Sequence, residues 1–403
     1  MHVDHLSPAA VAILLCSTFG TLAEEGAAPH SSEAPEPDLP TISAVVDIQA
    51  TSTDMDNDPN DNKVRIREAE IGAQGYLDPS VRGNLIVALE QEYAVDGSTE
   101  TDVHIEEAYV SLLDLPGGLY SHIGRKLMGF GRLTPVHRHH WAVADMPLAL
   151  GNFFGEHPWL DDGVEIGYLV PNPFGIYLKL SAGAWNGSAL GHVHAHEEED
   201  HDEHEEDVVH EDDDHEEDHE GQHGDAIDWD GHVFTGRVFA DLPLSDSLNA
   251  QLGYSVAGDE GENVLHGADL VLRLRCPETD RLVKWHTECF AFEGEDSSPY
   301  GLFSLLQVTL DEQWAVGGRY DWTELLHDDG EDTWAGTGFV SYHLTHTTYV
   351  RGQYQHREHA DGETEHTVTA QLVWGIGPHH ELPSPATTPS PRQHDACHDA
   401  CHH

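Results

Sequence analysis

From residue 41 onward, apolar and polar residues alternate with a period close to two. In 248–256 every second residue is apolar or aromatic, and the residues between them are Asn, Gln, Gly and Ser; 367–376 repeats the pattern. Such alternation indicates strands with one apolar and one polar face, although the faces are mixed in 102–113 and 119–127. The pattern predicts about sixteen strands, at 41–50, 64–77, 81–93, 102–113, 119–127, 161–170, 174–186, 230–242, 246–257, 264–275, 281–293, 299–310, 313–322, 333–344, 348–358 and 364–377.

Short and long connections alternate between these strands. The short ones are turn-like, as at 77–80, 115–118 and 276–279. The longer ones lie at 51–63, 94–101, 128–160, 187–229, 258–263, 294–298, 323–332 and 359–363. An even strand count with short periplasmic turns and longer external loops is typical of outer-membrane barrels. We therefore predict an all-β fold, a transmembrane antiparallel β-barrel of about 16 strands with long external loops.

A soluble β-sandwich or jelly roll would also have strands of period two, but these strands are usually shorter. Most strands predicted here have the roughly 9–11 residues that a tilted strand needs to cross a bilayer. No segment approaches the roughly 18 consecutive apolar residues of a spanning helix, which excludes a helical membrane protein. Aromatic residues towards strand ends or along strands are typical of interface girdles, and favour the barrel: Tyr76, Tyr93, Tyr109, Trp185, Trp285, Trp314, Trp322, Trp334, Tyr342 and Trp374.

The two ends of the chain differ from the barrel region, 41–377. Residues 1–23 contain an apolar run followed by small residues, which indicates a signal peptide and export. Residues 24–40 are acidic and Pro-rich, as an unstructured leader would be, and 378–403 form a Pro-rich tail ending in Cys and His. Because the strand count is even, we expect this tail in the periplasm of a Gram-negative cell.

Several short motifs lie in and between the predicted strands. They are Glu106-Glu107-Ala108-Tyr109-Val110, Gly124-Arg125-Lys126, Gly129-Phe130-Gly131-Arg132-Leu133, His137, Asp145-Met146-Pro147-Leu148, Gly155-Glu156 and Trp374-Gly375-Ile376-Gly377-Pro378-His379. Together they resemble porin-superfamily outer-membrane β-barrels, in particular proteins labelled zinc-regulated TonB-dependent outer membrane receptor. That label implies a plug domain inside a barrel of about 22 strands. This chain is too short for both, so we expect a barrel without a plug domain, acting as a porin-like channel.

The connection 128–160 follows the fifth predicted strand, and its residues 142–150 tolerate a helix. The resemblance implies a constriction loop in the lumen, with His137, Arg138, His139 and His140 as its site residues; the alternative is an external lid. Strand parity places charges of both signs on the lumen side, as in a water-filled pore. These predicted pore-lining residues are Arg82, Glu90, Lys179, Arg237, Asp269, Arg273, Lys284, Glu288, Arg319, Arg351 and Arg357.

The external connection 187–229 carries the strongest chemical signal. Nine histidines lie there among acidic residues, seventeen of which fall between Glu197 and Glu220. Imidazole suits Zn, Cu and Ni, and carboxylates add ligands. The alternative for this connection is a solvated, self-repelling loop without specific binding. The alternatives for the tail are that Cys397 and Cys401 are oxidised or that the tail is disordered. The predicted ligands of loosely bound zinc, or another divalent metal, are His192, His194, His196, His201, His204, His210, His215, His219, His223, Cys397, His398, Cys401, His402 and His403.

Charge and motifs restrict the function further. Asp plus Glu total 74 against 18 Lys plus Arg, a formal net charge of −56, which argues against nucleic acid as a partner. No nucleophile with its base can be identified, so we expect neither an enzyme nor a catalytic cofactor. The expected partners are outer-membrane lipid and divalent metal ions, and a homo-oligomer is allowed. The sequence favours an outer-membrane channel that concentrates and passes divalent metal ions, zinc above all. The alternative is a non-conducting surface metal-binding or adhesion protein anchored by its barrel.

Overall fold

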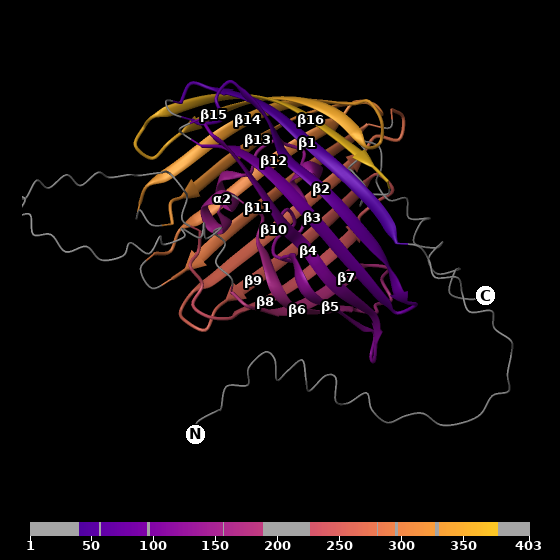
Figure 1. Ribbon diagram of the computed structural model, residues 1–403. Coiled ribbons are helices and arrows are strands. Elements are labelled where there is room, and N and C mark those ends of the chain that lie inside the picture. Colours follow the sequence, from indigo (N-terminus) through magenta and orange to yellow (C-terminus); the bar gives the residue numbers. More distant parts are fainter. Residues whose placement is uncertain are drawn as a thin grey trace, which may run out of the picture.

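In the computed structural model the chain closes into one antiparallel barrel with tilted strands (Figure 1). The structure describes residues 40–55, 58–94, 97–155, 157–187, 226–279, 281–294, 297–326 and 330–377. Each strand pairs with its sequence neighbours, and β1 pairs with β16 to close the barrel. This confirms the predicted sixteen-stranded fold. The strands are β1 Thr41–Thr53, β2 Lys63–Asp78, β3 Val81–Tyr93, β4 Thr99–Leu115, β5 Leu119–Leu127, β6 Leu160–Leu169, β7 Tyr177–Trp185, β8 Val233–Pro243, β9 Leu248–Gly258, β10 Val264–Arg275, β11 Leu282–Glu293, β12 Tyr300–Thr309, β13 Trp314–Glu324, β14 Asp332–His343, β15 Thr348–Glu358 and β16 Thr364–Ile376.

The predicted strand bounds agree with these to within a few residues, and β7 shows why they are not identical. The prediction began this strand at 174, whereas β7 begins at Tyr177. The Asn172 side chain accepts hydrogen bonds from the backbone N–H groups of Phe174 and Ile176, both at 3.2 Å. An Asn that bonds the backbone in this way stabilises a turn, so the turn continues to Ile176 before the strand starts.

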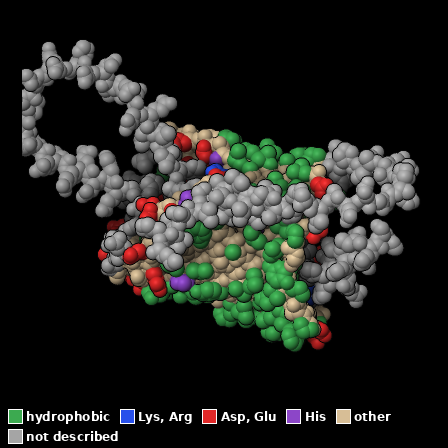
Figure 2. All heavy atoms as spheres, turned by 90° about the horizontal axis from the view of Figure 1, so that it is seen from below, with side chains coloured by type: hydrophobic (Ala, Val, Ile, Leu, Met, Phe, Trp, Pro, Cys, Tyr) green, Lys and Arg blue, Asp and Glu red, His purple; other side chains and the backbone are tan. Residues whose placement is uncertain are grey.

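The outer face of the barrel is apolar. Large hydrophobic side chains point outward and are exposed along the strands, among them Ile71, Val103, Leu252 and Val368. Figure 2 shows hydrophobic side chains covering much of the visible wall, with acidic side chains towards its ends. Lipid-facing strands have this band, and closure leaves no unpaired strand edge in the bilayer. In the described part of the chain, no helix has the length and hydropathy needed to cross a bilayer.

Two short helices lie in the connection between β5 and β6: the 3-10 helix η1, Arg138–His140, and the α-helix α2, Leu148–Phe154. The α-helix therefore lies later than the predicted helix-tolerant stretch 142–150. Pro147 precedes its first turn, and Gly155 ends it with a φ of 78°, where glycine meets no steric penalty. The helix packs against β12, β13 and β14 inside the barrel (Figure 1).

An apolar cluster fills part of the lumen along β7–β12. Its aromatic members from the β5–β6 connection are Phe130, Phe153, Phe154 and Trp159, and all four are buried. The end of the predicted external connection 187–229 packs against them. The Trp229 ring stacks on the Trp159 ring with 5.4 Å between the ring centroids. The Ile227 N–H donates a hydrogen bond to the Phe153 carbonyl at 3.1 Å. The described residues at the end of that connection thus lie inside the barrel.

Candidate metal centre in the barrel lumen

The connection between β5 and β6 lies inside the barrel and is bonded to its wall. The Asp145 carboxylate accepts hydrogen bonds at 2.6 Å from Arg319 on β13 and from Gln355 on β15. The neighbouring Ala144 bonds to β1 as well, because its carbonyl accepts from the Gln49 side chain at 2.9 Å. Hydrogen bonds to charged groups contribute about 1.5–3 kcal/mol each. The connection is therefore fixed across the lumen.

The start of this connection is fixed to another part of the wall. The Glu288 carboxylate on β11 accepts the backbone N–H groups of Arg132 and Leu133, each at 2.9 Å. Gly131 has a φ of 65°, and a Cβ there would collide with Glu288. Only glycine adopts this conformation readily in so little space. The glycine-containing motif 129–133 is thus the segment that docks on Glu288.

Five glutamates form a buried acidic wall on the inner face of β2, β3 and β4. This acidic wall consists of Glu68, Glu70, Glu90, Glu106 and Glu107. None is more than 8% exposed. Carboxylates at such depth are stable only when cations or hydrogen-bond donors face them, so the groups opposite the wall decide what it can bind.

Two β-bulges build this wall. The β3–β4 pairing shifts by one residue next to Glu107, which makes Glu106 the extra residue of β4. The β1–β2 pairing shifts in the same way, which makes Arg67 the extra residue of β2 and leaves Glu68 beside it. A bulge interrupts the alternation of faces, so two consecutive side chains point into the lumen. All four of these side chains are buried.

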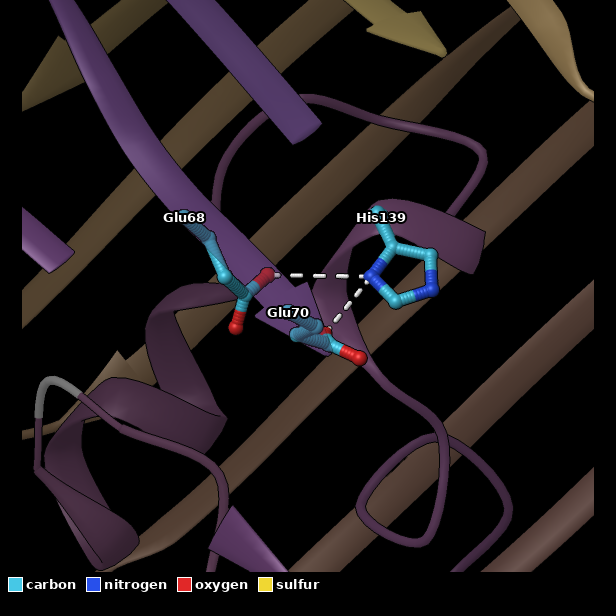
Figure 3. Close-up of side chains that lie close together, drawn as sticks. All are labelled: Glu68, Glu70 and His139. Atoms are coloured by element: carbon cyan, nitrogen blue, oxygen red, sulfur yellow. Dashed lines mark ion pairs between the residues drawn. The ribbon is translucent and has the colours of Figure 1, made fainter. Parts of the chain in front are cut away.

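Two histidines of the connection face the acidic wall. His139 Nδ1 lies 2.8 Å from Glu70 Oε1 and 3.7 Å from Glu68 Oε2, as Figure 3 shows. His137 Nδ1 lies 3.0 Å from Glu106 Oε1 and 3.4 Å from the same Glu70 oxygen. Glu70 therefore lies between the two imidazoles and contacts both.

The side chain between these histidines carries a permanent charge. Arg138 forms an ion pair with Glu90, and His157 Nδ1 lies 3.4 Å from the same carboxylate. The backbone of this turn is fixed as well, since the Tyr349 hydroxyl donates to the His139 carbonyl at 2.7 Å. The turn thus presents one guanidinium and two imidazoles to the wall in a defined geometry.

The carboxylates set the protonation of the loop histidines. Burial lowers the pKa of His139, but the charges and hydrogen bonds of Glu70 and Glu68 together outweigh burial and raise the pKa to about 9. Burial also lowers the pKa of His137, and the carboxylates of Glu106 and Glu70 raise it well above its ordinary value. Both imidazoles therefore carry protons near neutral pH. A metal ion bound there would displace these protons.

Two overlapping groups of side chains have donor atoms suited to a metal ion. They are Glu68, Glu70 and His139, and Glu70, Glu106 and His137; within each group the donor atoms lie within 4.8 Å of one another. The Oε2 atoms of Glu70 and Glu106 are buried and accept no hydrogen bond from any described residue. Imidazole and carboxylate donors suit zinc and neighbouring divalent metals. The donor set therefore fits a divalent cation.

The sequence predicted only part of this centre. Strand parity and the loop motif singled out Glu90 and residues 137–140, which the structure brings together. The sequence analysis did not predict Glu68, Glu70, Glu106 or Glu107 as site residues, although Glu106 and Glu107 lie in a motif that carries the family resemblance. Glu68 and Glu70 carry a weak signal, two acids at strand spacing in the predicted strand 64–77, but nothing in the sequence shows that a loop faces them.

The other predicted site residues fall into two groups. The eleven predicted pore-lining residues share the inward side of their strands with the buried positions. Among them, Arg237 pairs with Asp269 at 2.7 Å, and Arg351 donates to the Trp141 carbonyl at 2.8 Å. The predicted metal ligands within 192–223 and 397–403 lie outside the described residues.

Sequence comparison finds little that resembles this chain. No family model matches it. A stretch of 90 residues is 39% identical to an uncharacterized protein of Aquifex aeolicus (strain VF5), and it covers 22% of this chain and 18% of that protein. This chain therefore spans only a small part of that relative. The resemblance to zinc-regulated TonB-dependent receptors stays a prediction.

Solved structures show the fold clearly. The anion-selective porin from Comamonas acidovorans matches with a TM-score of 0.52 and 13% identity, over 84% of this chain and 99% of that chain. Salmonella typhi OmpF in complex with daunomycin matches with a TM-score of 0.54 and 9% identity, over 84% and 97%. Pseudomonas putida OprB at high pH matches with a TM-score of 0.50 and 8% identity, over 84% of this chain and 94% of that chain. The chain has the porin fold. Together with the apolar outer face, this fold places the chain in the outer membrane of a Gram-negative cell.

Proposed function

We propose that the protein is a porin-like channel that concentrates divalent metal ions, zinc above all, and passes them through the outer membrane. The observation that carries the proposal is the pair His137 and His139, held by the loop against the acidic wall inside the barrel. Donors of this kind bind divalent cations. They lie in the lumen, and we assign them to the path of ions that cross the barrel.

The distribution of apolar side chains supports a path along the acidic wall. The apolar cluster occupies the lumen beside β7–β12, whereas β2–β4 present buried carboxylates that face the charged turn 137–139. Ions avoid apolar surfaces and follow polar linings. A cation entering from outside would therefore pass the carboxylates of the acidic wall.

Charge outside the lumen supports the concentrating step. The chain carries a formal net charge of −56, and a field of one sign raises the local concentration of counter-ions at a pore mouth. The His- and acid-rich segment 192–223 contributes a large share of this charge together with imidazole donors. We assign to it the capture of zinc ahead of Mg²⁺ and Ca²⁺, which favour oxygen ligands.

Zinc uptake by proteoliposomes tests the proposal. Liposomes that hold a zinc-sensitive dye should fill with zinc when the protein is inserted. Glu70→Gln should slow zinc uptake about tenfold, which corresponds to about 1.4 kcal/mol, while uptake of a neutral sugar stays unchanged. Glu165→Gln is the matched control, because Glu165 is buried on β6 beside Lys126, outside the metal-binding groups. Zinc entry no faster than in protein-free liposomes would refute the channel.

One observation favours the alternative, a non-conducting surface protein that binds metal. The packed aromatic side chains Phe130, Phe154, Trp159 and Trp229 block part of the lumen. If the block extends across the pore, the barrel serves as an anchor. Purified protein that binds zinc but admits neither zinc nor sugar into liposomes would support this alternative.

A further inference from the structure

We infer that the lumen holds a two-ion centre in which the Glu70 carboxylate bridges two divalent cations. The inference rests on the proposed function in taking divalent cations as the ligand, and it adds their number and shared donor. Two-metal sites hold their ions about 3.5–4 Å apart. Glu70 is the one residue common to both groups of metal donors in the described part of the chain.

The distances around Glu70 allow a bridge. Its Oε1 atom lies 2.8 Å from His139 Nδ1 and 3.4 Å from His137 Nδ1. Its Oε2 atom is buried and accepts no hydrogen bond from the described residues. One oxygen thus lies between the two imidazoles and the second has a free coordination position. A carboxylate with two oxygens so placed can bind one ion on each side.

Each ion would have three donors from the protein. The first ion would be held by Glu68, Glu70 and His139, the second by Glu70, Glu106 and His137. Bonds of about 2.0–2.2 Å to zinc bring donors to roughly 3.3 Å from one another, so donors within 4.8 Å need only small side-chain rotations. Three protein donors leave a fourth position open, as in zinc sites that exchange a ligand. This suits ions that enter and leave.

The charge of the site also fits two ions. Arg138 neutralises Glu90 through its ion pair. The four remaining carboxylates of the acidic wall carry four negative charges when both imidazoles are neutral, and two divalent cations balance them. A single divalent ion with one protonated imidazole would leave one of these negative charges buried and unbalanced.

The fourth carboxylate positions a histidine. Glu107 Oε2 lies 3.8 Å from His137 Nε2, the ring nitrogen away from Glu70, and it accepts a hydrogen bond from the Asn84 side chain at 2.7 Å. A carboxylate behind the far nitrogen of a metal-bound histidine fixes its tautomer and orientation. Glu107 therefore leaves the Nδ1 atom of His137 for the second ion.

Anomalous diffraction from zinc-soaked crystals of the full chain tests the two-ion centre, because it locates each ion whatever other segments bind. We expect two peaks about 3.5–4 Å apart on either side of Glu70. Glu106→Gln should leave one peak, at Glu68 and His139. Glu70→Gln should remove both peaks, and Glu165→Gln should keep both. An unheated sample of each variant should migrate differently from a heated one, which shows that the barrel has folded.

A single peak, no peak at the acidic wall, or two peaks that survive Glu70→Gln would overturn the two-ion centre. These outcomes are separate from those of the transport assay. Zinc entry into liposomes with one bound ion would leave the channel standing and refute the bridge. Two bridged ions without zinc entry would establish the centre in a barrel that does not conduct zinc.

Discussion

Asp145 ties the β5–β6 connection to the barrel wall. Its carboxylate accepts hydrogen bonds from Arg319, Gln353 and Gln355, which lie on two strands. Arg319 is fully buried and also pairs with Asp321 at 2.6 Å. Since Asp145 is the only one of these residues on the connection, it fixes the middle of the connection beside the turn that carries His137 and His139.

Replacing Asp145 tests this role. Asp145→Asn should lower the free energy of unfolding by about 1–3 kcal/mol, because the hydrogen bonds would lose their charged acceptor. A loosened connection should also raise single-channel conductance. Denaturant titration and bilayer recordings measure the two effects.

The matched control is Asp162→Asn. Asp162 pairs with Arg125 at 2.8 Å, but both side chains are more than a third exposed, and exposed pairs contribute about 0–1 kcal/mol. We expect the control to leave stability and conductance nearly unchanged. Equal effects of the two substitutions would show that Asp145 has no special part in holding the connection.

The contacts of Asp145 could not be predicted from the sequence. Its partners Arg319 and Gln353 lie 174 and 208 residues away along the chain, and strand parity shows only that these side chains face inward. The family resemblance marks the motif 145–148, but it does not say which residues Asp145 contacts. The same limit applies to Glu70, whose partners are on a loop that no periodicity describes.

At the scale of elements, the strands were predictable and the bulges were not. Strands such as β3 and β10 have the predicted bounds, because one face of each is apolar and the period is two throughout. The predicted strand 102–113 showed mixed faces, and the bulge at Glu106 explains why. After the bulge the inward positions change parity, so a single pattern cannot fit the strand.

Deleting Glu106 tests the bulge as a device that adds a carboxylate to the lumen. The pairing on both sides of the bulge keeps its register when the extra residue is removed. The barrel should therefore still fold and insert, as judged by the shift in migration on heating. Zinc bound at the acidic wall should fall from two ions to one in anomalous maps.

A matched deletion of Ala108, which follows the bulge in the same strand, serves as the comparison. Loss of the bulge would keep the pairing from Tyr109 onward in register, but Glu107 would take the outward place of Ala108 opposite Leu85. A carboxylate on the lipid-facing side should impair insertion. If both deletions insert equally well, the bulge is not needed to place Glu107 in the lumen.

At the scale of the whole molecule, the orientation in the membrane can be tested at a turn. Cys276 lies in the short connection between β10 and β11 and is a free, exposed thiol. Hydrogen bonds from the Thr279 side chain, and then from the backbone of Glu278 and Thr279, lower the pKa of the Cys276 thiol. More thiolate is then present at neutral pH, so the thiol should react readily.

Because short turns face the periplasm in such barrels, a maleimide on a large polymer should label Cys276 only in permeabilised cells. Peptide mapping by mass spectrometry identifies the labelled residue, and Cys276→Ser provides the control. Labelling of Cys276 in intact cells would reverse the orientation and place the long connections in the periplasm.

The His- and acid-rich segment should act on zinc capture and leave the pore intact. Deleting 192–223 should preserve single-channel conductance, remove most of the zinc bound by the purified protein and slow growth under zinc chelation. Binding should weaken in acid as histidines protonate near their ordinary pKa of about 6.5. Normal growth under chelation, together with undiminished zinc binding, would show that this segment does not capture zinc.

The central claim, a channel that passes divalent cations along the acidic wall, is tested most directly by the reversal potential in a planar bilayer under a zinc chloride gradient. The account predicts unitary currents whose reversal potential has the sign of zinc permeation, and a shift towards zero in Glu70→Gln but not in Glu165→Gln. A reversal potential of chloride sign, or no unitary current from folded protein, would contradict it.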